Sequence, residues 1–256
     1  MTALLADTLA LSQSTLFWGF IVFLRVGAAM MLLPAFGEQS IPVRVRLALA
    51  LAFTLIVAPA ILPDLLVSQQ TATAKYFLTE AVTGLAIGFV VRLFIIALQV
   101  TGAVAAQSTS LSQLFGGLSA DPSPAIGNLL VLGGLALAVT TGLHVRLVEL
   151  FLISYQVFPA GVFPLANILV DWEVARIAHA FGMGFTLAAP FVIASLIYNV
   201  ALGVINRAMP QLMVAFVGAP AITAGGLILL MLTAPYLLGI WIDTLNRFLA
   251  SPFGAP

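Results

Sequence analysis

Long apolar runs, separated by short polar connectors, dominate the chain. These runs extend over Leu9–Leu33, Leu47–Leu62, Phe77–Ala106, Ile126–Gly142, Leu147–Phe158, Ile177–Asn206 and Gln211–Leu249. Several of them match or exceed the roughly 20 apolar residues with which a helix crosses a bilayer. The pattern predicts an all-α, hydrophobic, membrane-type protein of about six to eight helical segments.

Prolines and one polar segment are expected to divide these helices. A proline removes a backbone donor and disfavours the helical conformation of the residue before it. We expect helix ends at Pro34, Pro59 and Pro63, a kink at Pro190 and breaks at Pro220 and Pro235. The segment Asp171–Arg176 is the most polar point of the second half. It is the best candidate for a boundary between two halves of the chain.

A polar tip separates the last two apolar runs. Arg207 is the only Asp, Glu, Lys or Arg residue from Ile177 to Ile242, and Pro210 is expected to stop the helix that arrives there. The pattern predicts a helical hairpin with a tip formed by Asn206, Arg207, Pro210 and Gln211. Arg207 would either cap the last carbonyls of the helix or meet a carboxylate of a partner.

Composition supports the membrane class and excludes several functions. Hydrophobic residues make up 62% of the chain and charged residues 7%, which is far from the usage of soluble domains. The formal net charge is zero and no basic block occurs, so we expect no nucleic-acid surface. The absence of cysteine excludes disulfides, thiolate metal sites and thiol catalysis.

No motif for catalysis is present. His144 and His179 stand far apart, without H-E-x-x-H or paired carboxylates around them, which argues against a metal site. The chain also has no phosphate-binding G-x-x-x-x-G-K-[ST] segment and no G-x-S-x-G. We therefore expect no enzyme activity, no catalytic residue, no metal and no cofactor.

Arg25 is a charged residue inside the first apolar run. An ionisable group at membrane depth is costly, and this marks it as a candidate functional residue. The alternative is that the long arginine side chain extends to a nearby interface. Both interpretations remain open from the sequence.

A second charged pattern lies in the third run. Glu80, Gly84, Gly88 and Arg92 recur every fourth residue, so they share one helix face. The small residues would let another helix approach closely. Glu80 and Arg92 cannot pair with each other, since twelve residues separate them by about 18 Å. The face is either an ordinary packing surface or a polar relay.

The segment from Gln107 to Pro124 combines polar side chains with a short apolar stripe. Leu111, Leu114, Phe115 and Leu118 follow helical spacing around Gly116 and Gly117. The stripe would either rest on its own protein or enter a cavity, because irregular backbone at membrane depth needs protein or water around it.

The hairpin region carries a resemblance to a known family. Asn199-Val-Ala-Leu-Gly203, Asn206-Arg207, Pro210-Gln211 and Phe216-Val-Gly-Ala-Pro220 closely resemble the FliR/SctT family of type III export-gate proteins, and Gly218-Ala219-Pro220 looks more like the flagellar branch. Agreement elsewhere extends the resemblance over nearly the whole chain, at Arg25, Pro34, Phe36-Gly37, Pro42, Asp121-Pro122, Gly142 with His144, and Pro159 with Gly161.

The resemblance implies a subunit of a protein export gate in the bacterial inner membrane and the flagellar basal body. Kinked hairpins would assemble with FliP, FliQ and FlhB into a helical, conical gate for unfolded flagellar proteins. Residues 1–170 would be a FliP-like part, with residues 107–121 as a luminal plug, and residues 171–256 a FliQ-like hairpin. Members of the family look like transmembrane proteins, yet their partners hold them largely above the membrane plane.

Two other functions compete with this one. The first is the virulence branch of the same family. The second is a secondary transporter for a small molecule, which would carry ionisable residues in corresponding places of both halves. Arg25, Glu80 and Arg92 all lie in the first half, and this asymmetry argues against a transporter.

Overall fold

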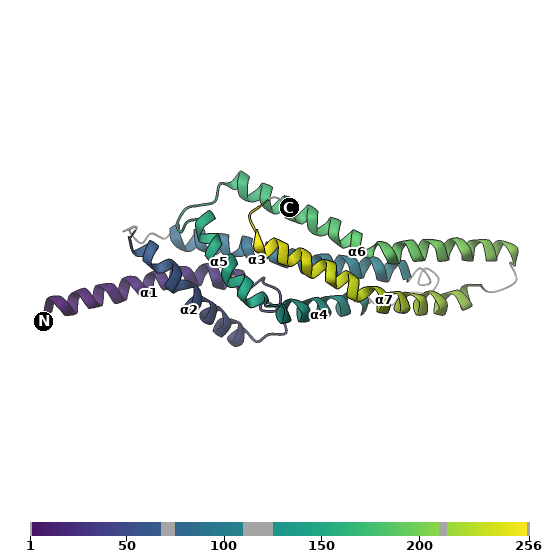
Figure 1. The fold of residues 1–256 in the computed structure, drawn as a ribbon, viewed down its shortest axis with the longest axis horizontal. Helices are drawn as coiled ribbons and strands as arrows, with labels where there is room; N and C mark the ends of the chain where they lie inside the picture. The colour runs from purple at the N-terminus through teal and green to yellow at the C-terminus, as the bar shows by residue number, and fades with distance from the viewer. Residues whose placement is uncertain (1, 68–74, 110–124, 210–213, 255–256) are drawn as a thin grey trace. The chain divides into compact units, whose positions relative to one another are not determined.

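The computed structural model describes residues 2–67, 75–109, 125–209 and 214–254 as seven helices with connecting turns and no strand. The helices are labelled in Figure 1. Their bounds are α1 Thr2–Met30, α2 Val43–Val67, α3 Lys75–Thr109, α4 Ala125–Thr140, α5 Leu143–Val157, α6 Ala166–Ala208 and α7 Val214–Ala250. The all-α architecture expected from the apolar runs is confirmed.

The prolines do not divide the helices as expected. Pro59 and Pro63 lie inside α2, and α7 continues through the positions of Pro220 and Pro235. Each proline removes one hydrogen bond from the ladder. The helical turns on both sides of the proline keep their hydrogen bonds, and helices in apolar surroundings tolerate the loss of a single backbone hydrogen bond. Our expectation of helix ends and breaks at these prolines was wrong.

A sharp bend does occur between α4 and α5. The two helices meet at an angle of 74° across a short break. Gly142 stands in this break with φ +91°, a conformation that glycine adopts without steric cost. The fourth and fifth apolar runs are therefore separate helices.

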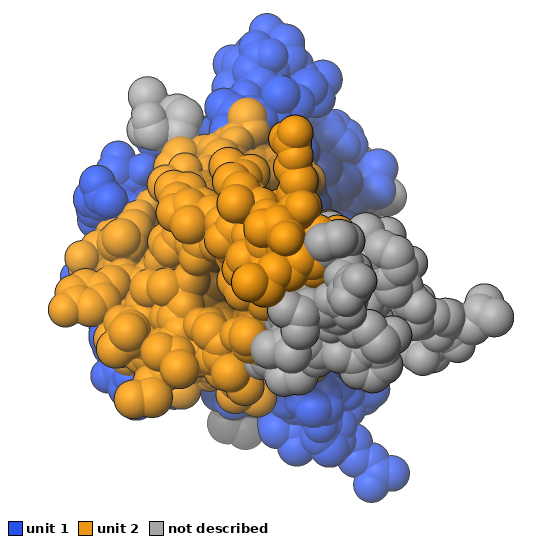
Figure 2. Space-filling view, turned by 90° about the vertical axis from the view of Figure 1, so that its right-hand side faces the viewer, with its two compact units in different colours: residues 1–93, 139–177, 247–256 blue, residues 94–138, 178–246 orange. Residues whose placement is uncertain are grey.

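The described chain forms two compact units. Unit 1 consists of residues 1–93, 139–177 and 247–256, and unit 2 of residues 94–138 and 178–246. Figure 2 colours them blue and orange. The polar segment Asp171–Arg176 lies within α6 and belongs to unit 1. The division at residue 170 into FliP-like and FliQ-like parts stays a prediction from the family resemblance.

Five helices are long and apolar enough to cross a membrane: α1, α2, α3, α6 and α7. The bent pair of α4 and α5 would provide a sixth crossing if it acts as one span. Their lengths and composition are those of a membrane-type protein.

Candidate functional site

Helices α1 and α3 approach each other closely in unit 1, because two glycines of α3 face the backbone of α1. A methyl group placed on Gly84 would lie 2.2 Å from the carbonyl oxygen of Arg25. On Gly88 it would lie 2.6 Å from the carbonyl oxygen of Ala29. Neither site has room for a larger residue, so glycine at both positions sets the spacing of the helices.

The two helices run parallel, as three contacts along them show. The Trp18 and Tyr76 rings meet edge to face with centroids 5.2 Å apart, Arg25 pairs with Glu80, and Ala29 lies against Gly88. Residue numbers rise together on both helices. This register brings the charged residue of α1 level with the acidic residue of α3.

Arg25 and Glu80 form a buried ion pair at this level. The Arg25 Nε donates to Oε2 of Glu80 at 2.7 Å, and Nη2 donates to Oε1 at 3.0 Å. Both side chains are 0% exposed. This bidentate geometry gives both carboxylate oxygens a hydrogen bond and is the strong form of an arginine–carboxylate contact. Arg25 therefore does not extend to an interface.

Helix α5 and the turn after it complete this cluster. Arg25 Nη1 donates to the Ser154 hydroxyl at 3.2 Å, and Nη2 donates to the carbonyl of Phe158 at 2.8 Å. Its guanidinium carbon lies 3.6 Å from the centroid of the Tyr155 ring, a cation–π contact. Arg25 thus binds α3, α5 and the following turn at once.

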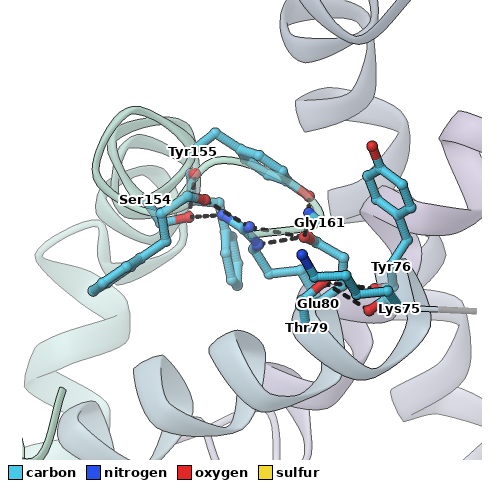
Figure 3. A network of polar contacts seen from close by, with 10 residues as sticks. Lys75, Tyr76, Thr79, Glu80, Ser154, Tyr155 and Gly161 are labelled. Carbon is cyan, nitrogen blue, oxygen red and sulfur yellow. Dashed lines mark hydrogen bonds and ion pairs between the residues drawn. The ribbon is translucent and has the colours of Figure 1, made fainter. Parts of the chain in front are cut away.

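Two further donors converge on the carboxylate of Glu80. The hydroxyl of Tyr155 donates to Oε2 at 3.2 Å, and the backbone N–H of Gly161 donates to Oε1 at 3.4 Å, as Figure 3 shows. Gly161 has φ +74°, and a methyl group there would lie 2.3 Å from the ring of Tyr76. Only glycine fits this place, and the sequence pattern alone did not identify these partners.

The fourth residue of the predicted face, Arg92, belongs to a different pair. It binds Glu38, which lies in the turn after α1, and about a quarter of each side chain is exposed. Arg46 donates to the carbonyl of Glu38 at 3.0 Å. Glu80 and Arg92 therefore serve two separate ion pairs on one helix.

The C-terminal segment docks on the polar part of α6, also in unit 1. The indole Nε1 of Trp172 donates to the carbonyl of Pro252 at 3.0 Å, and Arg176 donates to the carbonyls of Pro252 and Gly254. The ring of Phe253 meets the rings of Phe158 and Trp172. Trp172 and Arg176, within the segment that we also expect to be a boundary between the two halves, therefore anchor the C-terminal segment.

Unit 2 is held by close glycine contacts and by a buried hydrogen bond of a tryptophan. A methyl group on Gly102 of α3 would lie 2.1 Å from the Cα atom of Gly127 in α4, and one on Gly134 would lie 2.5 Å from Leu98. The buried indole of Trp241 in α7 donates to the carbonyl of Phe94 at 2.8 Å. We did not single out these residues, although small residues in apolar runs are a signal for close helix contact.

Unit 2 also has a pocket between α6 and α7. Its volume is about 280 Å³. Most of its lining is apolar, with Phe191, Ile222 and Leu229 among the residues and with Ser195 and Tyr198 as the polar ones. No charged residue lines it, so it offers no counter-charge to an ionic solute.

Two predicted sites lie wholly or partly outside the described residues. The plug residues Leu111, Leu114, Phe115, Gly116, Gly117 and Leu118 fall in residues 110–124. Pro210 and Gln211 of the hairpin tip fall in residues 210–213, whereas Asn206 and Arg207 are described and exposed. The plug and the partner contact at the tip stay predictions.

Within the described part of the chain, no group of three or more His, Asp or Glu side chains could hold a metal ion. The charged cluster around Arg25 is closed to solvent, and its partners are the protein's own groups. Its chemistry is that of a structural contact between helices.

The chain is similar to proteins of one family. Residues 16–248 match the family described as bacterial export proteins, family 1. A flagellar biosynthetic protein FliR from Caulobacter vibrioides is 34% identical over 90% of this chain and 93% of its own length. The proteins of the same name from Escherichia coli and Aquifex aeolicus are 29% and 28% identical, each over 88% of this chain and over 88% and 87% of their own lengths.

Proposed function

The chain belongs to the bacterial export proteins, family 1, and is a subunit of the flagellar export gate; we propose that it acts there without catalysis, as part of the gate wall. The match over nearly the whole chain carries the gate assignment. The closed, fully partnered charge cluster of unit 1 and the apolar lining of the unit 2 pocket support a structural role.

The length of α6 supports assembly with other proteins. At about 1.5 Å per residue, its 43 residues measure about 65 Å along the helix. A hydrocarbon layer of about 30 Å holds only about 39 Å of a helix that is tilted by about 40°, the upper end of the usual range. Part of α6 must then lie outside the hydrocarbon layer.

Apolar side chains are exposed along the whole of this helix. They include Ile168, Val174, Phe181, Phe185, Ile193, Ile197 and Val204. Whichever part of α6 enters the hydrocarbon, exposed apolar residues remain outside it, and large patches of this kind mark interaction sites. We propose that neighbouring gate subunits cover them.

The family resemblance suggests which proteins these are. We propose that the chain assembles with FliP and FliQ, that FlhB contacts the complex at its cytoplasmic mouth, and that the complex stands at the inner membrane in the flagellar basal body. Unfolded flagellar proteins would pass through it. The asymmetric placement of buried charges gives no support to a small-molecule transporter.

The experiment is purification of the tagged full-length chain from native membranes. We expect FliP and FliQ in the same complex. Ile197→Lys, which places a charge on the exposed face of α6, should reduce the recovery of both at least about tenfold, since a buried unpaired charge is costly. Gln156→Lys, at an exposed position of α5, is the matched control and should leave recovery unchanged. A solitary protein that binds a small solute would overturn the proposal.

A further inference from the structure

The first candidate membrane span contains a single charged residue. Arg25 is the only Asp, Glu, Lys or Arg residue between Gln13 and Met30, and this span has the lowest mean hydropathy of the five. A charge within a span raises the cost of insertion, and the apolar residues around it must offset this cost. Of the five candidate spans, α1 is thus the least favourable to insert into an apolar environment without partner helices.

The counter-charge for Arg25 comes from a later part of the chain. Glu80 follows 55 residues later on α3, and the other partners, Ser154 and the carbonyl of Phe158, follow 129 and 133 residues later. All three guanidinium nitrogens have partners on these elements. The span from Gln13 to Met30 has no acidic residue that could neutralise the charge.

Glu80 depends on Arg25 in the same way. It is 0% exposed, and its other donors are the neutral hydroxyl of Tyr155 and the N–H of Gly161. Loss of either charged partner would leave a lone buried charge, which is far more costly than loss of the whole pair. Each of the two buried charges is therefore stable only when the other is beside it.

We propose that the Arg25–Glu80 pair makes the docking of α1 conditional on α3 and α5. Helix α1 is synthesised first but reaches its final place last, when Glu80 and the turn at Phe158–Gly161 are available to it. The N-terminal helix is held by charge pairing with its own chain and is not a self-sufficient membrane span. This inference does not depend on which proteins surround the gate.

The test is a cycle of glutamine substitutions in the full chain, in native membranes. Glu80→Gln and Arg25→Gln each leave one buried charge, while the double variant Arg25→Gln with Glu80→Gln removes both and keeps amide groups for hydrogen bonding. The chain has no cysteine, so an introduced cysteine is the only thiol in the chain that can react with a labelling reagent. Val22→Cys reports on docking of α1, because Val22 is fully buried and cysteine is smaller than valine. Gln39→Cys, in the exposed turn after α1, is the accessible control.

With an unchanged pair, the thiol at position 22 should react slowly with N-ethylmaleimide and the thiol at position 39 quickly. Each single variant should speed the reaction at position 22 at least about tenfold, and the double variant should restore most of the protection. A thiol at position 22 that stays protected in Glu80→Gln would overturn the proposal.

Recovery of the protein gives a second readout if a single variant does not fold. The proposal then expects more double variant than either single variant in the membrane. Equal or lower recovery of the double variant would overturn the proposal, because the loss would then come from hydrogen bonds and packing and not from an unpaired charge.

Discussion

Unit 1 and unit 2 are both apolar and helical, and both have close glycine contacts between helices, but a buried charge cluster joins the helices of unit 1 in addition. Unit 1 joins α1, α3 and α5 through a charge pair and its hydrogen bonds, centred on Arg25 and Glu80. In unit 2, α3 and α4 touch backbone to backbone at Gly102 and Gly127. The Trp241 indole adds one buried hydrogen bond between α7 and α3.

The difference teaches that apolar composition alone does not hold such helices together. Where a protein is surrounded by apolar partners or lipid, burial of apolar surface does not favour one neighbour over another. Specific pairing then comes from charges that only one partner can neutralise, as at Arg25 in unit 1, or from shapes that only small residues allow, as at Gly84 in unit 1 and Gly102 in unit 2. Unit 1 should be sensitive both to charge and to side-chain size, and unit 2 to side-chain size.

The largest effect on stability is expected from Gly102→Leu in unit 2. Even the first carbon of the side chain would overlap Gly127, and backbone on both sides cannot yield without separating the helices. Overpacking of this kind costs about 3 kcal/mol or more. Gly182→Leu, in an open position of α6, is the control. Denaturation in detergent should show a large loss for the first variant only.

A smaller but still clear loss is expected from Gly84→Ala in unit 1. The added methyl group would push against the carbonyl of Arg25 and shift α1, at a cost of about 1–3 kcal/mol. Gly19→Ala, with nothing near its added methyl group, should be neutral or slightly stabilising. The thiol at position 22 should become reactive in Gly84→Ala alone. Equal protection in both variants would show that the two helices are not in tight contact.

Trp241→Phe should cost about 1–2 kcal/mol, because it removes the hydrogen bond to Phe94 but keeps an aromatic ring. The effect should appear as a lower midpoint of chemical unfolding in detergent. Trp172→Phe in unit 1 removes a comparable indole hydrogen bond, to Pro252, at a partly exposed site. It should therefore cost less, and a larger loss from Trp172→Phe would contradict the comparison.

The smallest effect on stability is expected from Arg207→Ala. Arg207 is exposed at the end of α6 and has no hydrogen bond or ion pair to another described residue. The purified chain should unfold as before, while flagellar export should fall if the tip meets a partner. Arg146→Ala, at another exposed arginine, should leave export intact. Normal export with Arg207→Ala would mean that the partner contact is wrong.

Much of the helix pattern was predictable from the sequence, since each apolar run became a helix. The helix ends were less so, because a proline such as Pro59 disrupts one turn while packing holds the turns around it. The charged residues Arg25, Glu80 and Arg92 were also visible in the sequence. Their partners were not, because ion pairs between distant residues depend on the helix register, which glycines at the interface set.

The other partners in the cluster, Ser154, Tyr155 and Gly161, could not be predicted from the sequence. Each residue is ordinary in its local sequence and acquires its role only where α5 and the following turn meet α3. Gly102 and Gly127 are similar, because a glycine in an apolar run has no mark that tells a backbone contact from an open position such as Gly182.

The central claim, that the chain is a subunit of the flagellar export gate, is tested most directly by deleting its gene in its own host and measuring flagellar proteins in the culture medium. We expect their export to stop while the cells keep growing, and to return when the full-length chain is supplied from a plasmid. Flagellar export that continues at its normal level in the deletion strain would contradict the account.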